Sequence, residues 1–389
     1  MDRVTGTYRS NSLAGETVRA FVPRPLPPAK PPLVIDGRLA ELHAAALAAV
    51  DRLAIAGTMV PSADWFLYGF VRKEAVVSSQ IEGTQATLQD VLEFEATAQT
   101  DRPDDVREVC NYVEALTWAR QQMNSERGLP LGTRLICEVH RRLLKGTRGE
   151  GKQPGELRRS QNWIGGTRPG NARFVPPPPD EVPGTLSALE KWLHSNDPLP
   201  PLVKAGLAHV QFETIHPFLD GNGRIGRLLI TLLIEHWHLM PSPLLYLSLA
   251  IKRRQQEYYG RLSAVRTDGD WEGWTTFYLD CVREAADDGV NVCQHLFSLL
   301  GRDRTALLGR RGVTIPAIQL LDHLPLQPIV TLARVIELLK TTKPTAAKAI
   351  AALEQARILR ETTGRKRDRV YAYQEYLETL THDTPPSPR

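Results

Sequence analysis

Apolar residues recur every three or four positions along most of the chain, which is the spacing of one face of an α-helix. Asp36 and Ser62 are expected to cap two of these segments, and Thr87 with Asp90 has the form of a capping box. The pattern predicts a mainly α fold. The expected helices are 37–54, 63–82, 88–96, 104–124, 131–145, 181–195, 199–215, 223–238 and 271–299.

Two segments depart from the helical pattern. Residues 21–32 hold six prolines, which favours an extended polyproline-type arm. Residues 161–179 place short β-type runs on either side of a turn rich in Gly, Pro and Asn, and end in four prolines. This order predicts an exposed β-hairpin, and its unpaired edges could bind an extended peptide.

The sequence changes in character again from about residue 312. Thr331 and Thr342 stand at expected helix starts, and Pro344 falls in the first turn of the second helix. A basic segment with the pattern of a β-hairpin follows. The order predicts a winged helix-turn-helix over 312–377, joined to the body by a linker at 301–312.

We therefore expect several domains. Residues 1–60 hold the arm and the first helix, 61–100 form a helical region packed on the core, and 101–300 form the core itself. The winged module follows at 312–377, and 378–389 are expected to be a disordered tail. The length of 389 residues fits two to three domains at about 150 residues each.

Composition excludes several classes of protein. The chain is 42% hydrophobic and 24% charged, and it lacks a run of the roughly 20 apolar residues that a membrane helix needs. Its start has no apolar stretch like that of a secretion signal. The four cysteines form no CxxC pair, so we expect reduced thiols in a cytoplasmic protein. The net charge of +4 gives no general case for nucleic-acid binding.

The segment 216–227, HPFLDGNGRIGR, carries the most chemical information. Pro217 disfavours helix at His216, so the preceding helix should end there and leave the imidazole in a loop. Gly221, Asn222 and Gly223 allow a tight turn whose backbone N–H groups can bind an anion as the next helix begins.

Charged residues complete this loop. Arg224 and Arg227 are three positions apart on the first turn of the helix, where both could contact neighbouring phosphates. Asp220 is placed to hold Mg²⁺ against phosphate oxygens. A histidine before proline is most often structural, and a DGNG run is most often only a turn. Their combination within twelve residues favours a nucleotide site.

Two other glycine-rich segments do not predict nucleotide binding. Residues 221–226 match GxGxxG, but no strand precedes them as a dinucleotide-binding fold requires. Residues 146–153 approach a P-loop, yet Gln153 stands where a Mg²⁺-binding Ser or Thr would be. We interpret this segment as a basic loop.

The segment 216–227 resembles the full signature of the Fic family, HPFx(D/E)GN(G/K)RxxR, with every signature position filled. The similarity extends over roughly residues 60–285. It implies an all-α core that carries a β-hairpin flap at 161–175, with the winged helix-turn-helix as a small additional domain. It also implies transfer of AMP from ATP to a Ser, Thr or Tyr hydroxyl of a protein, with release of pyrophosphate.

The resemblance further implies a role for each signature residue. His216 would be the general base, Asp220 the Mg²⁺ ligand and Phe218 the buried anchor of the loop. The β/γ end of ATP would be held by Arg224 and Arg227. The remaining expected nucleotide contacts are Gly221, Asn222, Gly223 and Gly226 in the loop, and Val175 in the flap.

Residues 78–83, SSQIEG, resemble the inhibitory motif of the family, (S/T)xxxE(G/N). Ser78 and Glu82 are four positions apart on one helical face, and Gly83 fits a helix C-cap. By the resemblance, Glu82 pairs with Arg227 and holds ATP in an unproductive position, so the resting enzyme is autoinhibited. Taken alone, the same pattern also fits a solvated helix end.

The segment 257–274 resembles the helix that closes over the adenine, with Tyr258 and Tyr259 at the base. One of the two tyrosines could instead belong to the core. In relatives an Asn often stands seven residues after the second Tyr, whereas this chain has Arg266. The contact with adenine at that position is therefore open.

The resemblance implies that a protein target pairs with the flap. Self-modification, AMP removal and a homodimer stay open as further possibilities. No membrane partner is expected. The alternative function is a nucleotide-sensing transcriptional regulator that binds DNA through 312–377. The cations that could contact DNA phosphates are Lys343, Lys348, Arg365, Lys366, Arg367 and Arg369.

Overall fold

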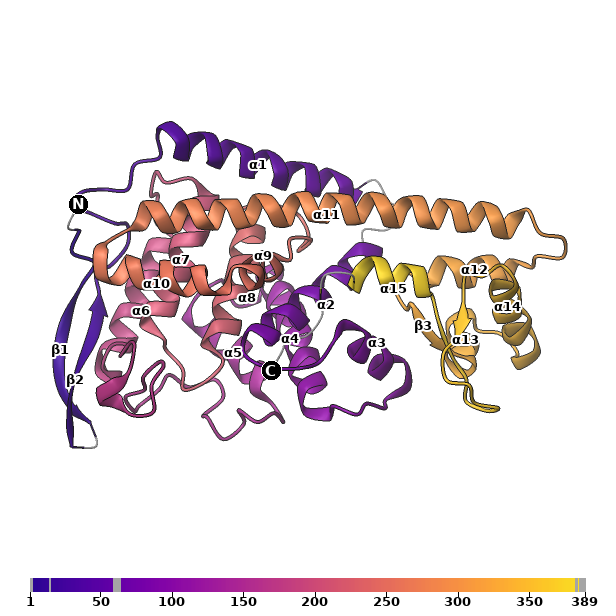
Figure 1. Ribbon diagram of the computed structural model, residues 1–389, viewed down its shortest axis with the longest axis horizontal. Coiled ribbons are helices and arrows are strands. Elements are labelled where there is room, and N and C mark those ends of the chain that lie inside the picture. Colours follow the sequence, from indigo (N-terminus) through magenta and orange to yellow (C-terminus); the bar gives the residue numbers. More distant parts are fainter. Residues whose placement is uncertain (1–2, 14, 59–63, 382–383, 385–389) are drawn as a thin grey trace. The chain divides into compact units, whose positions relative to one another are not determined.

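The computed structural model of the protein describes residues 3–13, 15–58, 64–381 and 384, and it confirms the mainly helical fold (Figure 1). The expected cap Ser62 lies outside these residues. The chain forms two compact units. The first comprises Met1–Asp51, Cys110–Pro241 and Ala250–Ala285, and the second comprises Arg52–Val109, Ser242–Leu249 and Ala286–Arg389.

Most helices and strands lie entirely within one or the other of the two units. The first unit holds β1 (Gly6–Leu13), β2 (Glu16–Pro23), α5 (Thr133–Leu144), η1 (Pro169–Asn171), η2 (Pro179–Glu181), α6 (Val182–Leu193), α7 (Pro201–Ile215), α8 (Asn222–His236) and α10 (Gln255–Asp268). The second holds α2 (Asp64–Ile81), α3 (Leu88–Thr97), α12 (Ile315–His323), β3 (Ile329–Thr331), α13 (Leu332–Leu339), α14 (Lys343–Gln355), β4 (Arg360–Glu361), β5 (Val370–Ala372) and α15 (Gln374–Thr381). Helices with residues in both units are α1 (Gly37–Thr58), α4 (Pro103–Met123), α9 (Leu247–Arg253) and α11 (Trp271–Leu308).

Helix α7 is the centre of the first unit. Its side chains are buried on every face from residue 202 to residue 215, as expected of a helix surrounded by others. It packs against α6 and α8. Gly206 permits close approach of the aromatic residues of α11, because Trp274 Nε1 donates to the Gly206 carbonyl at 2.9 Å and the Tyr278 ring lies against the glycine. This rigid helix ends at the segment 216–227.

The N-terminal region differs from the expected extended arm. Strands β1 and β2 form an antiparallel hairpin in the register Gly6↔Pro23 to Leu13↔Glu16. Val18, Ala20 and Phe21 of β2 are buried. The proline-rich residues begin where the hairpin ends, and Arg3 binds the carbonyls of Pro31 and Pro32. The hairpin was not predicted, because its buried face is short and its partners lie elsewhere in the chain.

Helix α2 is fixed within the second unit by contacts with residues 242–249. The Glu74 carboxylate accepts hydrogen bonds from the Ser248 backbone N–H, at 3.0 Å, and from its hydroxyl. Lys73 Nζ lies 4.3 Å from the centre of the Tyr246 ring, and Phe70 meets the same ring edge to face. Helix α3 then begins at the capping box predicted for Thr87 and Asp90, which is confirmed.

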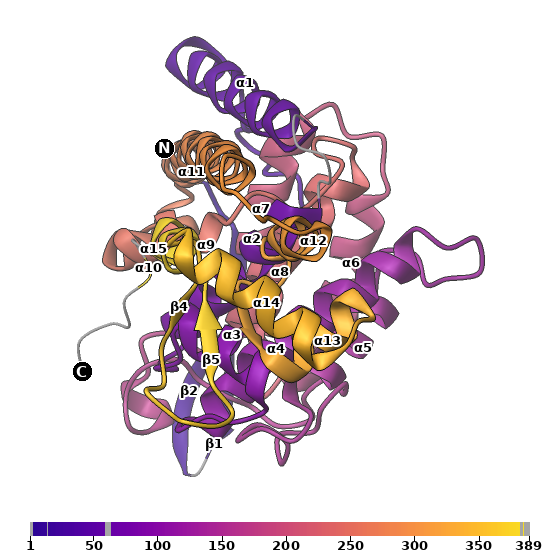
Figure 2. The same ribbon diagram turned by 90° about the vertical axis from the view of Figure 1, so that its right-hand side faces the viewer.

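The C-terminal module consists of α12, α13 and α14 with a three-stranded antiparallel sheet in the order β3-β5-β4. Figure 2 labels its three helices and the strands β4 and β5. The Thr331 side chain accepts the Arg334 N–H at 3.2 Å and caps α13. Thr342 is the N-cap residue of α14, with Pro344 in its first turn. Both helix starts agree with the sequence.

Three boundaries differ from those expected. The segment 257–274 is two helices, α10 and α11, separated at Gly269, whose φ of 69° is left-handed. Helix α11 continues to Leu308, so most of the linker predicted at 301–312 is helical. Helix α15 extends to Thr381, so the disordered tail predicted for 378–389 is wrong over residues 378–381.

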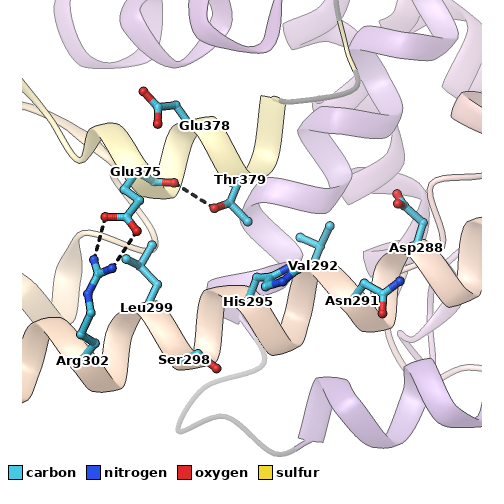
Figure 3. A pocket seen from close by; sticks show the side chains of 10 residues that line it. All are labelled: Asp288, Asn291, Val292, His295, Ser298, Leu299, Arg302, Glu375, Glu378 and Thr379. Atoms are coloured by element: carbon cyan, nitrogen blue, oxygen red, sulfur yellow. Dashed lines mark hydrogen bonds and ion pairs between the residues drawn. The ribbon is translucent and has the colours of Figure 1, made fainter.

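Helix α15 packs on the part of α11 that belongs to the second unit. Arg302 of α11 donates to both carboxylate oxygens of Glu375, at 2.8 and 2.7 Å (Figure 3). Buried Tyr373 donates its hydroxyl to Asp303 at 2.6 Å. A cavity of about 760 Å³ lies beside these residues, lined by His295 and Asp288 among others. None of the described helices has the length and apolar character needed to cross a membrane.

Candidate functional site between α7 and α8

His216 lies directly after α7, as the sequence predicted. The helix ends at Ile215, and His216 is in the left-handed region with φ of 49°. Its N–H still donates to the Phe212 carbonyl at 2.9 Å. Histidine tolerates this backbone region better than most residues, and the conformation turns the chain out of the helix axis. The imidazole is thus attached to the end of a buried, rigid helix.

Asn222 closes the loop through its side chain. The carboxamide Nδ2 donates to the Phe218 carbonyl at 2.8 Å, and Oδ1 accepts the Phe218 N–H at 2.9 Å. Phe218 is fully buried, as expected of an anchor. Gly221 supplies the left-handed N-cap of α8, with φ of 75°. The Asn222 side chain therefore shapes the loop, and its predicted contact with phosphate stays a prediction.

Arg158 holds the same loop from outside and was not found from the sequence. Its guanidinium donates to the carbonyls of His216, at 2.8 Å, and Pro177, at 2.6 Å, while its backbone N–H donates to the Pro217 carbonyl at 2.9 Å. Burial lowers its pKa to about 10. Arg158 is one of two arginines in the segment GELRRS, and nothing local distinguishes it, because its partners lie some 20 to 60 residues away.

His140 is a second residue that the sequence did not reveal. Its ring stacks on Phe218, with centres 3.8 Å apart. Nδ1 accepts the Gly155 N–H at 2.8 Å, so Nε2 carries the proton and donates to the Asp220 carbonyl at 3.0 Å. Burial lowers the pKa of His140 to about 4, which keeps the ring neutral. Its position in the apolar stripe of α5 was the available signal.

Asp220 presents the exposed carboxylate of the loop. Its Oδ1 accepts the Gly221 N–H at 2.7 Å, and its Oδ2 lies 3.9 Å from Arg224. A side chain at Gly149 would approach Oδ2 to 2.8 Å, so the basic loop 146–153 passes close to this carboxylate. The described residues contain no cluster of three metal-ligating side chains. One accessible carboxylate fits Mg²⁺ that takes its other ligands from phosphates and water.

The two arginines and Gly226 occupy the buried first turns of α8. Arg224 and Arg227 are each less than 5% exposed. Gly226 faces α7, where a Cβ would lie 2.4 Å from Glu213 Oε1 and 3.2 Å from the His209 ring. This position gives Gly226 a packing role, and its nucleotide contact stays a prediction.

The two tyrosines of α10 have different surroundings. Tyr258 is buried, and its hydroxyl lies 2.9 Å from His209 Nε2. Burial lowers the pKa of His209 to about 3, so this ring is neutral. Tyr259 is 48% exposed. Of the pair, Tyr258 is a core residue and Tyr259 is the one open to a ligand.

The flap is less regular than the predicted β-hairpin. One antiparallel bridge joins Ile164 and Phe174, and the helix η1 forms its tip. Arg266, which replaces the expected Asn, stacks its guanidinium on the Phe174 ring at 3.9 Å. The base of the flap is tied to the loop, because Asn162 Nδ2 donates to the Phe218 carbonyl at 3.2 Å.

The N-terminal hairpin completes the flap. The Phe21 N–H donates to the Val175 carbonyl at 2.9 Å, and Val18, Ala20 and Val175 form a small buried cluster. Val175 is thus buried against β2, and its predicted nucleotide contact stays a prediction.

The residues of the expected inhibitory motif belong to the second unit. Ser78 is fully buried in α2. The helix ends at Ile81, and exposed Glu82 follows with its N–H bonded to the Ser79 carbonyl at 3.0 Å. Gly83 has φ of 101°, as a C-cap requires. Arg227 belongs to the first unit, and the pairing of Glu82 with Arg227 stays a prediction.

Comparison with protein families agrees with the sequence motif. The "Fic/DOC family N-terminal" model matches residues 40–121, and the "Fic/DOC family" model matches residues 130–234. The second range contains the flap and the segment 216–227. The first range contains Ser78 and Glu82.

Several known proteins are similar to this chain. Proteins named "Protein adenylyltransferase Fic" from Drosophila grimshawi and Drosophila yakuba are 29% and 28% identical over 212 residues. The match covers 53% of this chain and 40% or 39% of theirs, so the chain spans about two fifths of these relatives. The crystal structure of a Fic family protein from Desulfovibrio desulfuricans has a TM-score of 0.56 at 22% identity, covering 88% of this chain and 98% of that one. A Fic domain-containing signaling protein from Bacteroides thetaiotaomicron gives 0.51 at 19% identity, covering 64% and 97%.

Proposed function

Because this chain is a Fic-family protein, we propose that it is a protein adenylyltransferase, which transfers AMP from ATP to a side-chain hydroxyl of a protein. The observation that carries the proposal is the loop between α7 and α8. Its His216 is fixed by the backbone at the end of a buried helix, directly before a helix N-terminus. A base beside a phosphate-binding helix start is what transfer at phosphorus requires.

The nucleotide phosphates bind at the start of α8 in this proposal. Backbone N–H groups of Asn222 and Gly223 in the first turn of α8 would bind phosphate oxygens. The Gly221 N–H donates to Asp220 Oδ1 at 2.7 Å and would exchange that acceptor for a phosphate oxygen. Arg224 and Arg227 add positive charge at the same place. The exposed ring of Tyr259 is the surface against which a base can stack.

Magnesium is the metal that fits this loop. Asp220 would hold it, because its carboxylate is accessible and its backbone carbonyl is already fixed by His140. The ion would neutralise charge on the phosphates as pyrophosphate departs. The chemistry of the donor, a single hard carboxylate beside a phosphate site, is the support for Mg²⁺.

The reaction itself needs one proton transfer. The target hydroxyl oxygen forms a bond to the α-phosphorus of ATP, and the bond from that phosphorus to the bridging oxygen breaks, which releases pyrophosphate. His216 takes the hydroxyl proton. An ordinary neutral imidazole can do so near pH 7, and fixed positions with charge neutralisation provide most of the acceleration.

The target hydroxyl is presented by the flap in this proposal. An extended segment of the target pairs with the main chain of residues 161–175, so main-chain register selects the modified side chain. Self-modification remains compatible with this arrangement.

All four cysteines lack a disulfide, which supports a reducing, cytoplasmic location for the protein.

We also propose that Glu82 inhibits the enzyme. Its support is the motif at the end of α2, which combines a buried Ser78, an exposed Glu82 and a left-handed Gly83. The Glu82 carboxylate would compete with the γ-phosphate for Arg227. A preference of a few kcal/mol for the inhibited state is enough for a change in activity of about 10²-fold.

Labelling with α-³²P-ATP tests both assignments. The wild-type protein should label itself and lysate proteins weakly, the Glu82→Gly variant strongly, and the Glu82→Gly/His216→Ala variant not at all. Calorimetry of Mg²⁺-ATP binding serves as the control, since the double variant should still bind nucleotide. Label that persists without His216 would refute the assigned base.

A further inference from the structure

The C-terminal module is not used by the reaction proposed above, and it contains a separate charged cavity. The cavity has a volume of about 740 Å³. It is lined by residues from the start of α13, the start of α14 and the wing, which we define as residues 362–369 between β4 and β5. Figure 2 shows the wing as the loop that joins β4 and β5. Ala96, Thr97 and Gln99, at the end of α3, line the remaining side of the cavity.

Positive charge is concentrated in this cavity. Among the residues that line it, Asp368 is the single acidic one. The cations that line it are Lys343, Arg365, Lys366, Arg367 and Arg369, and all five are exposed. None of them forms an ion pair with a carboxylate in the described part of the chain.

Three other arginines in or beside the module are paired with carboxylates. Arg302 pairs with Glu375, Arg304 with Asp322 and Arg334 with Glu337. Cations held close together repel one another. Asp368 and Glu361 offset only part of this repulsion, and an anionic partner removes more of it. The wing also has internal order, since Arg369 Nε donates to the Arg365 carbonyl at 2.9 Å and the Glu361 carboxylate accepts the Thr363 and Gly364 N–H groups. The cations are thus presented by an ordered loop.

We propose that this face binds duplex DNA, through phosphates that cross the cavity. A small anion would need convergent, buried donors, whereas these cations are exposed and spread over a helix and a separate loop. That distribution fits a repeating row of phosphates. Helix α14 has 13 residues and carries Lys343 and Lys348 on its exposed side, and an α-helix of this kind fits a major groove.

Binding depends mainly on the DNA backbone. The exposed positions of α14 include Pro344 and Ala347 and offer few side chains that can read base edges. Phosphate contacts carry little sequence information and are sensitive to salt. The contact region also includes Gln99, so bound DNA reaches the end of α3, one helix after the expected inhibitory motif.

Fluorescence anisotropy of the full-length protein with a labelled 20-base-pair duplex of arbitrary sequence tests the proposal. Affinity should fall as salt rises, with a slope of log K against log salt of about −4 for four to five phosphate contacts. The Lys343→Glu/Arg367→Glu variant should bind at least about tenfold more weakly and show a slope shallower by about two. Arg38→Glu/Lys191→Glu is the matched control, because it changes net charge equally at exposed positions of the first unit.

Several results would overturn the proposal. They are absence of binding at 50 mM salt, equal loss of binding in the control variant, or equal or tighter binding of single-stranded RNA or of phosphatidylserine vesicles.

Two single substitutions test whether the end of α3 belongs to the DNA-binding surface. Gln99→Glu adds a negative charge inside the cavity and should weaken binding about threefold or more, whereas Gln89→Glu, outside it, should not. Binding is measured without ATP, so its outcome is independent of AMP transfer.

Discussion

At the scale of single residues, the position of His216 is set by groups that bind its backbone. Arg158 holds the His216 carbonyl and the Pro177 carbonyl, and thereby joins the loop to the base of the flap. Arg158 is nearly fully buried. A buried guanidinium with carbonyl partners cannot be removed without leaving those carbonyls unsatisfied.

Replacing Arg158 with alanine should therefore destabilise the protein by about 3 kcal/mol and lower AMP transfer by more than tenfold. Arg158→Lys should keep part of the stability lost in the alanine variant, but an ammonium cannot reproduce the donors that a guanidinium offers to two carbonyls. Its rate of AMP transfer should therefore stay low. Arg159→Ala is the matched control, since its side chain is 81% exposed and pairs with Glu156. Urea unfolding and initial labelling rates measure the two effects, and equal behaviour of the 158 and 159 variants would contradict this role.

His140 makes stability depend on pH. Its pKa is about 4 in the folded protein, because burial disfavours the charged ring, against 6.5 for an ordinary histidine. Between these values the unfolded chain binds a proton that the folded chain does not. Stability is therefore fully present above pH 6.5 and falls as pH decreases toward 4, by up to about 1.4 kcal/mol per pH unit.

The His140→Gln variant tests this dependence. It keeps a donor for the Asp220 carbonyl but cannot titrate, so its stability should decline less steeply between pH 6.5 and 4 than that of the wild-type protein. Urea unfolding at several pH values measures the slope. His209, with a pKa of about 3, contributes to the remaining decline in both proteins. Parallel curves for the variant and the wild type would show that His140 already carries its proton when folded.

At the scale of elements, the flap depends on the N-terminal hairpin. Its own strands share a single bridge, and an isolated pair of strands is marginally stable in water. Strand β2 adds the bond from Phe21 to Val175, and Glu16 accepts the Gly170 N–H at 2.6 Å beside an ion pair with Arg168. The hairpin therefore determines how rigid the flap is.

Replacing Glu16 with alanine should release the flap tip. Amide exchange in residues 166–171 should become about fivefold faster, while exchange in α7 and α8 stays unchanged. Arg168 and the Gly170 N–H hold the pKa of Glu16 below its usual range, so acid that protonates Glu16 should have the same effect in the wild-type protein. Exposed Glu41 in α1 provides the control variant, Glu41→Ala. If amide exchange at the flap tip is equally slow in both variants, Glu16 does not hold the tip in place.

The elements also show what sequence can and cannot reveal. Helices with a clear apolar face were predicted, and so was the loop 216–227, because its functional groups are adjacent in the chain. Arg158, His140 and the β1–β2 hairpin act on partners far away in sequence, and no local pattern records such partners. The flap was expected to be a regular hairpin, yet left-handed Gly165 and Gly166 and the helix η1 limit its pairing.

At the scale of the second unit as a whole, the C-terminal helix supports the segment that carries Glu82. Leu380 of α15 packs on Gly69 of α2, where a Cβ would lie 3.0 Å from the leucine. The Tyr376 hydroxyl lies 3.3 Å from the Trp65 carbonyl, and Gln80 Nε2 lies 3.5 Å from the Thr384 carbonyl. Helix α2 is thus held at its beginning, middle and end by the last residues of the chain.

Loss of this support should activate the enzyme. Leu380→Ala should cost about 2–4 kcal/mol of stability through the cavity it leaves, and it should raise self-labelling from α-³²P-ATP toward the level of Glu82→Gly. Glu378→Ala, at an exposed position of the same helix, should change neither quantity. Since both changes act through Glu82, the Glu82→Gly/Leu380→Ala variant should label no faster than Glu82→Gly alone. The Leu380→Ala protein could be less stable, still folded at the assay temperature and labelled only at the wild-type rate. That result would show that α15 does not control the activity.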